Sequence, residues 1–209
     1  MFLRCLFAAA IALLLSGCTG WWSETRLIPA GARDPAGLSG VYVSGEDRAN
    51  LSPTAEGFLR TTDLTGNTPP SDAAFALLRE EAPRPSLFAE AESDESEPPR
   101  APMPDRSYLM EIPFTGDDGE TAYTYAIGRI GFAPDGSAYK LELFTLLCSE
   151  ASEVFAARKE PQVCIFDDYA RLRAAAFDAL AWYDDARMSL ETTTWEREVE
   201  IEDIEPDAP

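Results

Sequence analysis

The segment TAYTYAIGRIGF, Thr121 to Phe132, alternates large apolar or aromatic side chains with smaller or polar ones. A period of two residues is typical of a strand that buries one face. Turn sequences bound the segment, GDDG before it and PDG after it, and their glycines adopt positive φ at little cost. The runs 107–114 and 138–148 repeat the strand pattern, so we expect an antiparallel meander of three strands over 107–148.

One amphipathic helix is expected after the meander, over residues 168–182. The apolar residues that recur there at helical spacing are Tyr169, Leu172, Ala176, Phe177 and Leu180. They form one stripe along the helix, and either Asp167 or Asp168 caps its first turn. Strand alternation returns near residues 190–201. These elements predict an α+β fold, in which a small curved antiparallel sheet packs against the helix, with its core over 107–202.

The chain before the meander is expected to hold two strands and a linker. Strand-like runs lie within residues 37–66. Within residues 67–106, the stretch from Glu90 to Pro104 is rich in Glu, Ser and Pro, and it buries too little apolar surface to offset the entropy of ordering it. We therefore expect an inserted flexible, acidic and proline-rich linker, with one short helix at 71–81. An acidic tail is expected at 203–209.

The first residues have the features of an export signal. Arg4 precedes an apolar run from Cys5 to Leu15, which is shorter than the ~20 residues that span a bilayer. The run ends in Leu15-Ser16-Gly17-Cys18, which resembles the lipobox of bacterial lipoproteins. The resemblance implies that residues 1–17 are a signal peptide that is removed. It also implies that Cys18 is acylated, as by palmitate, and anchors the chain in a membrane.

The residues after Cys18 add a location. In the lipoprotein class, an acidic residue after the cysteine retains the protein at the inner membrane. Thr19 stands there in this chain, so the resemblance implies the periplasmic face of the outer membrane of a Gram-negative bacterium. Residues 18–36 lack periodicity and are expected to form a tether. Trp21 and Trp22 lie either at the membrane surface or against the folded domain.

Composition excludes several classes of function. The formal net charge is −20, from 37 acidic and 17 basic residues, and such a chain repels nucleic acid. Histidine is absent, which removes the nucleophile pairs that use imidazole as a base and all His-ligated metal sites. We expect no metal, no other cofactor and no enzymatic activity.

The cysteines predict one disulfide. Cys5 leaves with the signal peptide and Cys18 becomes the lipid carrier, so Cys148 and Cys164 remain. Two thiols in a chain bound for the oxidising envelope are expected to pair.

Several residues could contact a ligand. Arg129 either clamps an anionic group or pairs with Glu142 or Glu111 across the sheet. The aromatic residues Tyr123, Tyr125 and Tyr139 either line a wall for a lipid or glycan or pack in the core. The tripeptide Gly40-Val41-Tyr42 is similar to the opening G-x-W of lipocalins, with tyrosine in place of tryptophan; three residues assign no site.

The leading hypothesis is a non-enzymatic, lipid-anchored envelope protein whose periplasmic domain contacts another envelope component. The alternative is a binding module for a small amphiphile on a tyrosine-rich sheet face, and a third hypothesis is a hydrolase that uses only carboxylates. A cavity of several hundred Å³ enclosed by the sheet and the helix would favour the binding module, and a filled core would remove it. A filled core with an exposed apolar patch would favour the partner-contacting protein.

Overall fold

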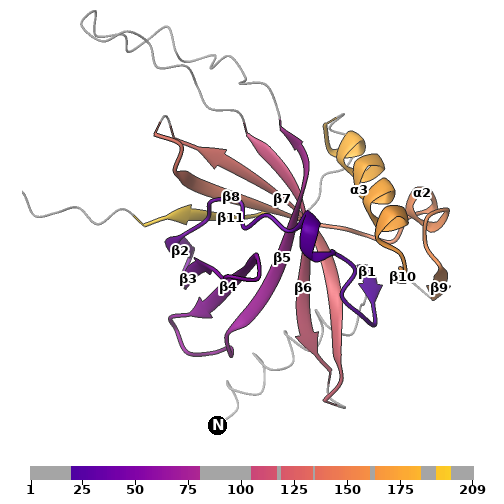
Figure 1. The fold of residues 1–209 in the computed structure, drawn as a ribbon, viewed down its shortest axis with the longest axis horizontal. Coiled ribbons are helices and arrows are strands. Elements are labelled where there is room, and N and C mark those ends of the chain that lie inside the picture. Colours follow the sequence, from indigo (N-terminus) through magenta and orange to yellow (C-terminus); the bar gives the residue numbers. More distant parts are fainter. Residues whose placement is uncertain are drawn as a thin grey trace, which may run out of the picture.

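The predicted meander is present and belongs to a closed barrel (Figure 1). We describe a computed structural model, which covers residues 20–80, 105–116, 119–133, 135–160, 163–184 and 192–198. Strands β6 (Arg106–Thr115), β7 (Thr121–Phe132) and β8 (Ala138–Thr145) form the meander. Each pairs with the next in antiparallel register.

Five further strands complete the barrel. Before the meander come β2 (Gly40–Ser44), β3 (Asp47–Pro53), β4 (Phe58–Asp63) and β5 (Ser71–Glu80), and after it comes β11 (Thr192–Arg197). Neighbouring strands are antiparallel throughout. Strand β11 pairs with both β8 and β2 and thereby closes the ring of eight strands.

The expectation of an α+β fold with an open curved sheet is therefore wrong. Because β11 joins β8 to β2, the sheet closes on itself. It thereby covers its own inner face, and no helix is needed to do so. Ser71–Glu80 is a strand, although a short helix was expected at 71–81. Its run from Ala73 to Leu78 is apolar on both faces because both faces are covered, so the sequence lacks the alternation that identifies a half-exposed strand.

Three short strands extend from the barrel. Strand β7 is longer than β8, and its first part pairs instead with β1 (Gly20–Ser23), where Trp22 lies opposite Thr124. Strand β10 (Val163–Ile165) runs parallel to β1, and β9 (Arg158–Glu160) is antiparallel to β10. A short helix, α2 (Glu150–Glu153), lies between β8 and β9.

The predicted helix is α3 (Tyr169–Asp184), and it lies against the outside of the barrel (Figure 1). Asp168 caps it, accepting a hydrogen bond of 2.9 Å from the backbone N–H of Arg171. Leu172, Ala176 and Leu180 of the predicted stripe are buried, whereas Phe177 is 38% exposed. Within the described ranges, no helix has both the length and the apolar character needed to cross a membrane.

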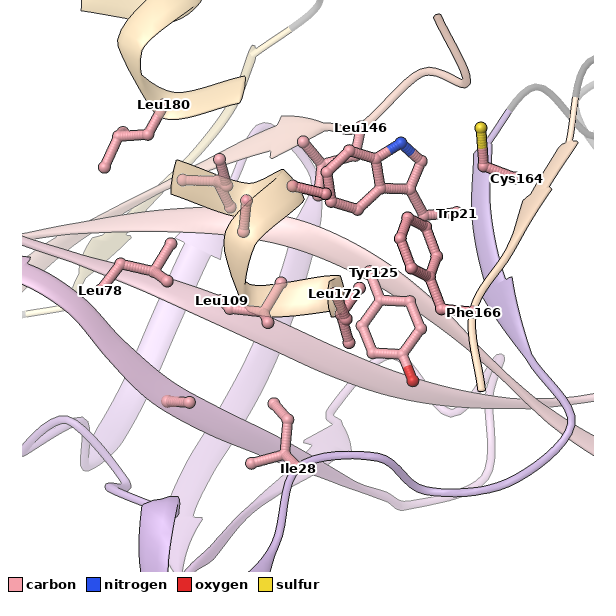
Figure 2. Close-up of a cluster of buried hydrophobic side chains, with 14 of the residues drawn as sticks. Trp21, Ile28, Leu78, Leu109, Tyr125, Leu146, Cys164, Phe166, Leu172 and Leu180 are labelled. Carbon is pink, nitrogen blue, oxygen red and sulfur yellow. The ribbon is translucent and has the colours of Figure 1, made fainter. Parts of the chain in front are cut away.

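The helix covers an outer cluster of buried apolar residues, built on the outward faces of β5, β6 and β7. Figure 2 shows the rings of Trp21, Tyr125 and Phe166 close to Leu172 of α3. The buried members of the outer cluster are Trp21, Ile28, Ala74, Ala76, Leu78, Leu109, Tyr125, Ile127, Leu146, Cys164, Phe166, Leu172, Ala175, Ala176 and Leu180.

A separate inner cluster occupies the interior of the barrel. Because side chains alternate along a strand, the same strands that supply the outer cluster also supply the inner one. The buried members of the inner cluster are Ala36, Leu38, Tyr42, Ala49, Leu51, Leu59, Ala73, Phe75, Tyr108, Met110, Ile130, Phe132, Ala138 and Leu141.

From residue 20 onward, the segment expected to be a tether is packed on the barrel. Trp21 is 1% exposed, its indole N–H donates to the carbonyl of Leu147 at 3.1 Å, and its ring centroid lies 5.0 Å from that of Phe166. Trp22 is half-buried against Phe114. A short 3-10 helix, η1 (Ala30–Ala32), follows. Of the two alternatives for the tryptophans, the structure supports packing on the folded domain.

Candidate functional site

One end of the barrel is closed by the chain that leads into β2. Leu38 and Tyr42 are fully buried there, beside Tyr108 and Phe132. The hydroxyl of Tyr42 donates to the carbonyl of Ala138 at 2.8 Å. Burial, together with the charge of Asp34, raises the pKa of Tyr108 to about 12. This end is therefore filled with large side chains and sealed.

Toward the other end, the interior holds a cavity of about 190 Å³. Strands β3, β4, β5, β6, β8 and β11 contribute its walls. The residues that line it are Ala49, Leu51, Leu59, Thr61, Ser71, Ala73, Phe75, Met110, Ile112, Leu141, Leu143 and Trp195. An eight-stranded barrel is just wide enough for side chains to fill it, or for one small ligand.

Small side chains keep this space open. Ala49 and Ala73 point inward and line the cavity with single methyl groups. Gly128 on β7 makes room for Met110, since a Cβ at position 128 would lie 2.7 Å from the Met110 Sδ. Empty space inside a protein loses dispersion contacts and so lowers stability. The apolar cavity is therefore the candidate binding site.

The cavity has a buried floor and a partly exposed mouth. Leu59, Phe75 and Met110 are buried at its floor. Thr61 and Ser71 are partly exposed, and they pair with each other on β4 and β5 just before the turn that joins these strands. The mouth thus lies at the end of the barrel where β4 turns into β5 and β6 into β7 (Figure 1).

The chemistry of the lining favours binding. None of the described residues that line the cavity carries an ionisable side chain, and the polar groups are the hydroxyls of Thr61 and Ser71 and the indole N–H of Trp195. Such a surface can enclose an apolar group and donate or accept hydrogen bonds at its mouth. It offers no pair of groups for acid–base chemistry.

The residues singled out from the sequence as ligand contacts lie elsewhere. On β7, Tyr123, Tyr125 and Arg129 face outward, because the inward positions are Ala126, Gly128, Ile130 and Phe132. The Tyr123 ring lies 5.0 Å from the Arg26 guanidinium, and Tyr139 on β8 is 49% exposed. Alternation along β7 was clear from the sequence, but it does not say which of its two faces is the inside of the barrel.

Arg129 occupies the outer wall near β8. It lies opposite Glu142 in the β7–β8 register, and its guanidinium carbon is 5.5 Å from the Phe144 ring centroid. Glu111, the other partner weighed for Arg129, bonds to Arg26 instead. The four residues Tyr123, Tyr125, Tyr139 and Arg129 are therefore not brought together around the cavity.

The cavity residues that sequence reasoning missed come mainly from two strands. Ala73 and Phe75 belong to β5, where a helix was expected, and Trp195 belongs to β11. A strand assignment for 71–80 would have identified Ala73 and Phe75 as neighbours on one face.

A second polar site is buried in the outer wall at Glu111. Its side chain is fully buried and accepts hydrogen bonds from the backbone N–H groups of Leu27 at 2.6 Å and Ile28 at 3.1 Å. The Arg26 guanidinium lies 3.3 Å away, and the Tyr125 hydroxyl is also 3.3 Å away. These contacts satisfy both carboxylate oxygens, so Glu111 fastens the segment after β1 to the barrel.

The predicted disulfide between Cys148 and Cys164 is confirmed. It joins the chain that follows β8 to β10, and Cys164 is fully buried in the outer cluster. Among the described residues, no group of three or more Cys, Asp or Glu side chains is placed to hold a metal ion. Cys18, the predicted lipid carrier, lies outside the described residues.

Comparison with known proteins gives no relative. No protein-family model matches the chain, and neither the curated proteins nor the solved structures contain a match. The similarity of Gly40-Val41-Tyr42 to lipocalins is thus accompanied by no family match.

Proposed function

We propose that this protein is a lipid-anchored binding protein of the cell envelope that holds a small apolar or amphipathic molecule inside its barrel. The apolar cavity of about 190 Å³ is the observation that carries this proposal. Since apolar cavities of about 150 Å³ accept a benzene ring, the enclosed part of the ligand would contain about six to eight carbon atoms.

The cavity favours this proposal over the partner-contacting protein. A docking face for another protein is expected to be a contiguous apolar patch. The large apolar side chains that the described residues expose belong to different parts of the chain: Leu64, Leu77, Tyr139, Val154 and Phe177. The partner-contacting protein was expected to have a filled core, whereas the interior of this barrel holds a cavity. The carboxylate hydrolase is disfavoured as well, because the lining supplies no carboxylate from the described residues.

Attachment at Cys18 is part of the proposal. Cys18 precedes Gly20, the first residue of β1, by two positions, so a lipid on its thiol would lie within ~7 Å of the sheet, apart from the length of the side chain. The barrel would be held close to the bilayer, where amphipathic molecules concentrate. Cys18→Ser should abolish incorporation of a fatty-acid analogue and release the protein from membranes. Labelling that persists in this variant would contradict the anchor.

Ligand binding is tested with a series of straight-chain 1-alkanols and isothermal titration. The full chain carrying Cys18→Ser is used because it needs no detergent, which would compete for the cavity. Affinity should rise about fourfold with each methylene, since burying one contributes about 0.8 kcal/mol. It should level off once the cavity is full, with a Kd on the order of 0.1 mM for about seven buried carbons.

A matched pair of substitutions localises the binding. Ala73→Leu adds three carbon atoms inside the cavity, and Ala174→Leu adds the same atoms on the exposed face of α3. The first should weaken alkanol binding by at least about tenfold, which corresponds to about two lost methylene sites. The second should leave binding unchanged. If no alkanol binds, or if both variants bind equally well, the proposed function is wrong.

A further inference from the structure

We infer that the barrel selects amphiphiles with an uncharged head group, such as an alcohol, ester or amide, and rejects carboxylates and phosphates of the same chain length. The inference rests on the proposed function, since it assumes that the ligand occupies the cavity. It concerns a different feature of the molecule, the charge around the mouth.

The mouth fixes the direction of an amphiphile. The far end of the interior is sealed by Leu38, Tyr42 and Phe132, and the floor of the cavity is apolar. A ligand must therefore enter with its apolar end first and leave its head group at Thr61 and Ser71. These two hydroxyls can donate to a carbonyl or ether oxygen and accept from an alcohol or amide.

Two aspartates, Asp47 and Asp63, lie at this end of the barrel. Asp63 lies two positions beyond Thr61 on β4, and Asp47 lies two positions before Ala49 on β3. Residues two apart on a strand share one face, so both aspartates extend the inner faces of their strands toward the mouth. Ala49 and Asp63 are directly paired across β3 and β4, which brings the Asp63 position next to the cavity wall.

Asp63 keeps its charge at neutral pH. Its carboxylate accepts hydrogen bonds from the backbone N–H groups of Thr65, Asn67 and Thr68, and from the hydroxyls of Thr65 and Thr68. These bonds hold the pKa of Asp63 well below its usual range. They also hold the carboxylate within the β4–β5 turn, at the end of the barrel where the mouth lies.

The nearby arginines do not offset this charge. Arg48 and Arg60 occupy alternate positions on β3 and β4, on the outer face, where they pair with Glu198 and Asp72. Arg197 lies at the sealed end, beside Gly40. An anionic head group at Thr61 and Ser71 would therefore meet like charge, without a cation from the described residues that line the cavity. Two like charges about 8 Å apart near a protein surface repel enough to lower binding about fivefold to thirtyfold.

The test compares 1-octanol, octanoate and octyltrimethylammonium by isothermal titration on the full chain carrying Cys18→Ser. At low salt, octanoate should bind at least about fivefold more weakly than octanol, and the cation at least as tightly as octanol. Raising the salt to about 1 M should narrow the difference between octanoate and octanol, because the mouth is exposed to solvent and its charges are screened.

Two variants identify the source of the selectivity. Asp63→Asn should raise octanoate affinity by about threefold to fivefold and leave octanol within twofold. Asp72→Asn changes the net charge equally but on the outer face, and should change neither. If octanoate binds as tightly as octanol, or if octanoate and octyltrimethylammonium both bind more weakly than octanol by the same factor, the inference is wrong while the proposed function stands. If none of the three probes binds, the proposed function itself fails.

Discussion

The two faces of β5, β6 and β7 are built differently from the same strands. Their outer face is filled: α3 and the segment around β1 cover it, rings of Trp21 and Phe166 pack 5.0 Å apart, and Glu111 bonds to two backbone N–H groups. Their inner face contributes to a cavity of about 190 Å³. The outer face is therefore packed more completely than the inner one, where part of the interior stays empty.

Under the proposed function, this division separates stability from ligand binding. Changes in the outer cluster should unfold the protein with little direct effect on the cavity. Changes in the inner cluster should alter binding at a smaller cost in the free energy of unfolding.

Glu111→Ala should lower the free energy of unfolding by about 3–5 kcal/mol, because it leaves Arg26 and the N–H groups of Leu27 and Ile28 without their buried acceptor. Urea unfolding followed by circular dichroism measures the change. Glu198→Ala, which removes an exposed ion pair with Arg48, should cost less than about 1 kcal/mol. Equal losses in the two variants would show that Glu111 does not fasten the segment after β1.

Replacing Cys148 and Cys164 together by alanine should cost about 3 kcal/mol, because the unfolded chain regains the freedom of a loop with a sequence separation of 16. The same measurement on the unmodified protein, with and without reductant, checks the value. Octanol affinity should stay within about twofold, since the disulfide lies outside the cavity lining. A large loss of affinity at a temperature where the variant is folded would contradict the division.

Alkaline pH should weaken the protein through its buried tyrosines. Burial raises the pKa of Tyr108 to about 12, and it also raises the pKa of Tyr42 and of Tyr125. The folded state therefore keeps protons that the unfolded state loses above about pH 10, so stability is full below that pH and falls as pH rises. Tyr108 alone should lower the free energy of unfolding by about 1.4 kcal/mol for each pH unit between about pH 10 and 12.

Unfolding by urea at several pH values measures this dependence. Tyr108→Phe should make the fall with pH less steep, and Tyr139→Phe, at a side chain that is half exposed, is the control. If the free energy of unfolding of Tyr108→Phe falls with pH as steeply as that of the unmodified protein, the buried Tyr108 hydroxyl is not the source of this dependence.

The same substitution on the two faces gives the most direct comparison. Ala176→Leu adds bulk to the filled interface between α3 and the barrel, where Ala176 is fully buried, and should cost about 1–3 kcal/mol. Ala73→Leu adds the same bulk to the cavity and should change stability by less than about 1 kcal/mol. Thermal unfolding of both variants decides the point, and equal costs would show that the interior is as tightly packed as the outer cluster.

Local patterns predicted several elements correctly. The meander over 107–148, the helix that begins near Asp168 and the pairing of Cys148 with Cys164 are all present. Each depends on signals within a few residues: alternation between glycine turns, an apolar stripe after a capping carboxylate, and two thiols without other partners. The lipid at Cys18 stays a prediction.

The closed barrel and its cavity could not be predicted in this way. The sequence of β5 is typical of neither a helix nor a half-exposed strand, because α3 covers one face of this strand and the barrel interior covers the other. Closure depends on β11 reaching both β8 and β2, a pairing between residues about 150 positions apart for which alternation carries no information.

By itself, the sequence determined where strands turn, where the long helix begins, which two cysteines pair and which chemistries the lack of histidine removes, because these follow from local conformational preference and from side-chain chemistry. The closed fold fixes which face of each strand is the interior, and it places small residues such as Ala49 and Ala73 around a cavity there. The physical reason is that alternation defines two faces of a strand equally well, and only the closing of the ring makes one of them the inside.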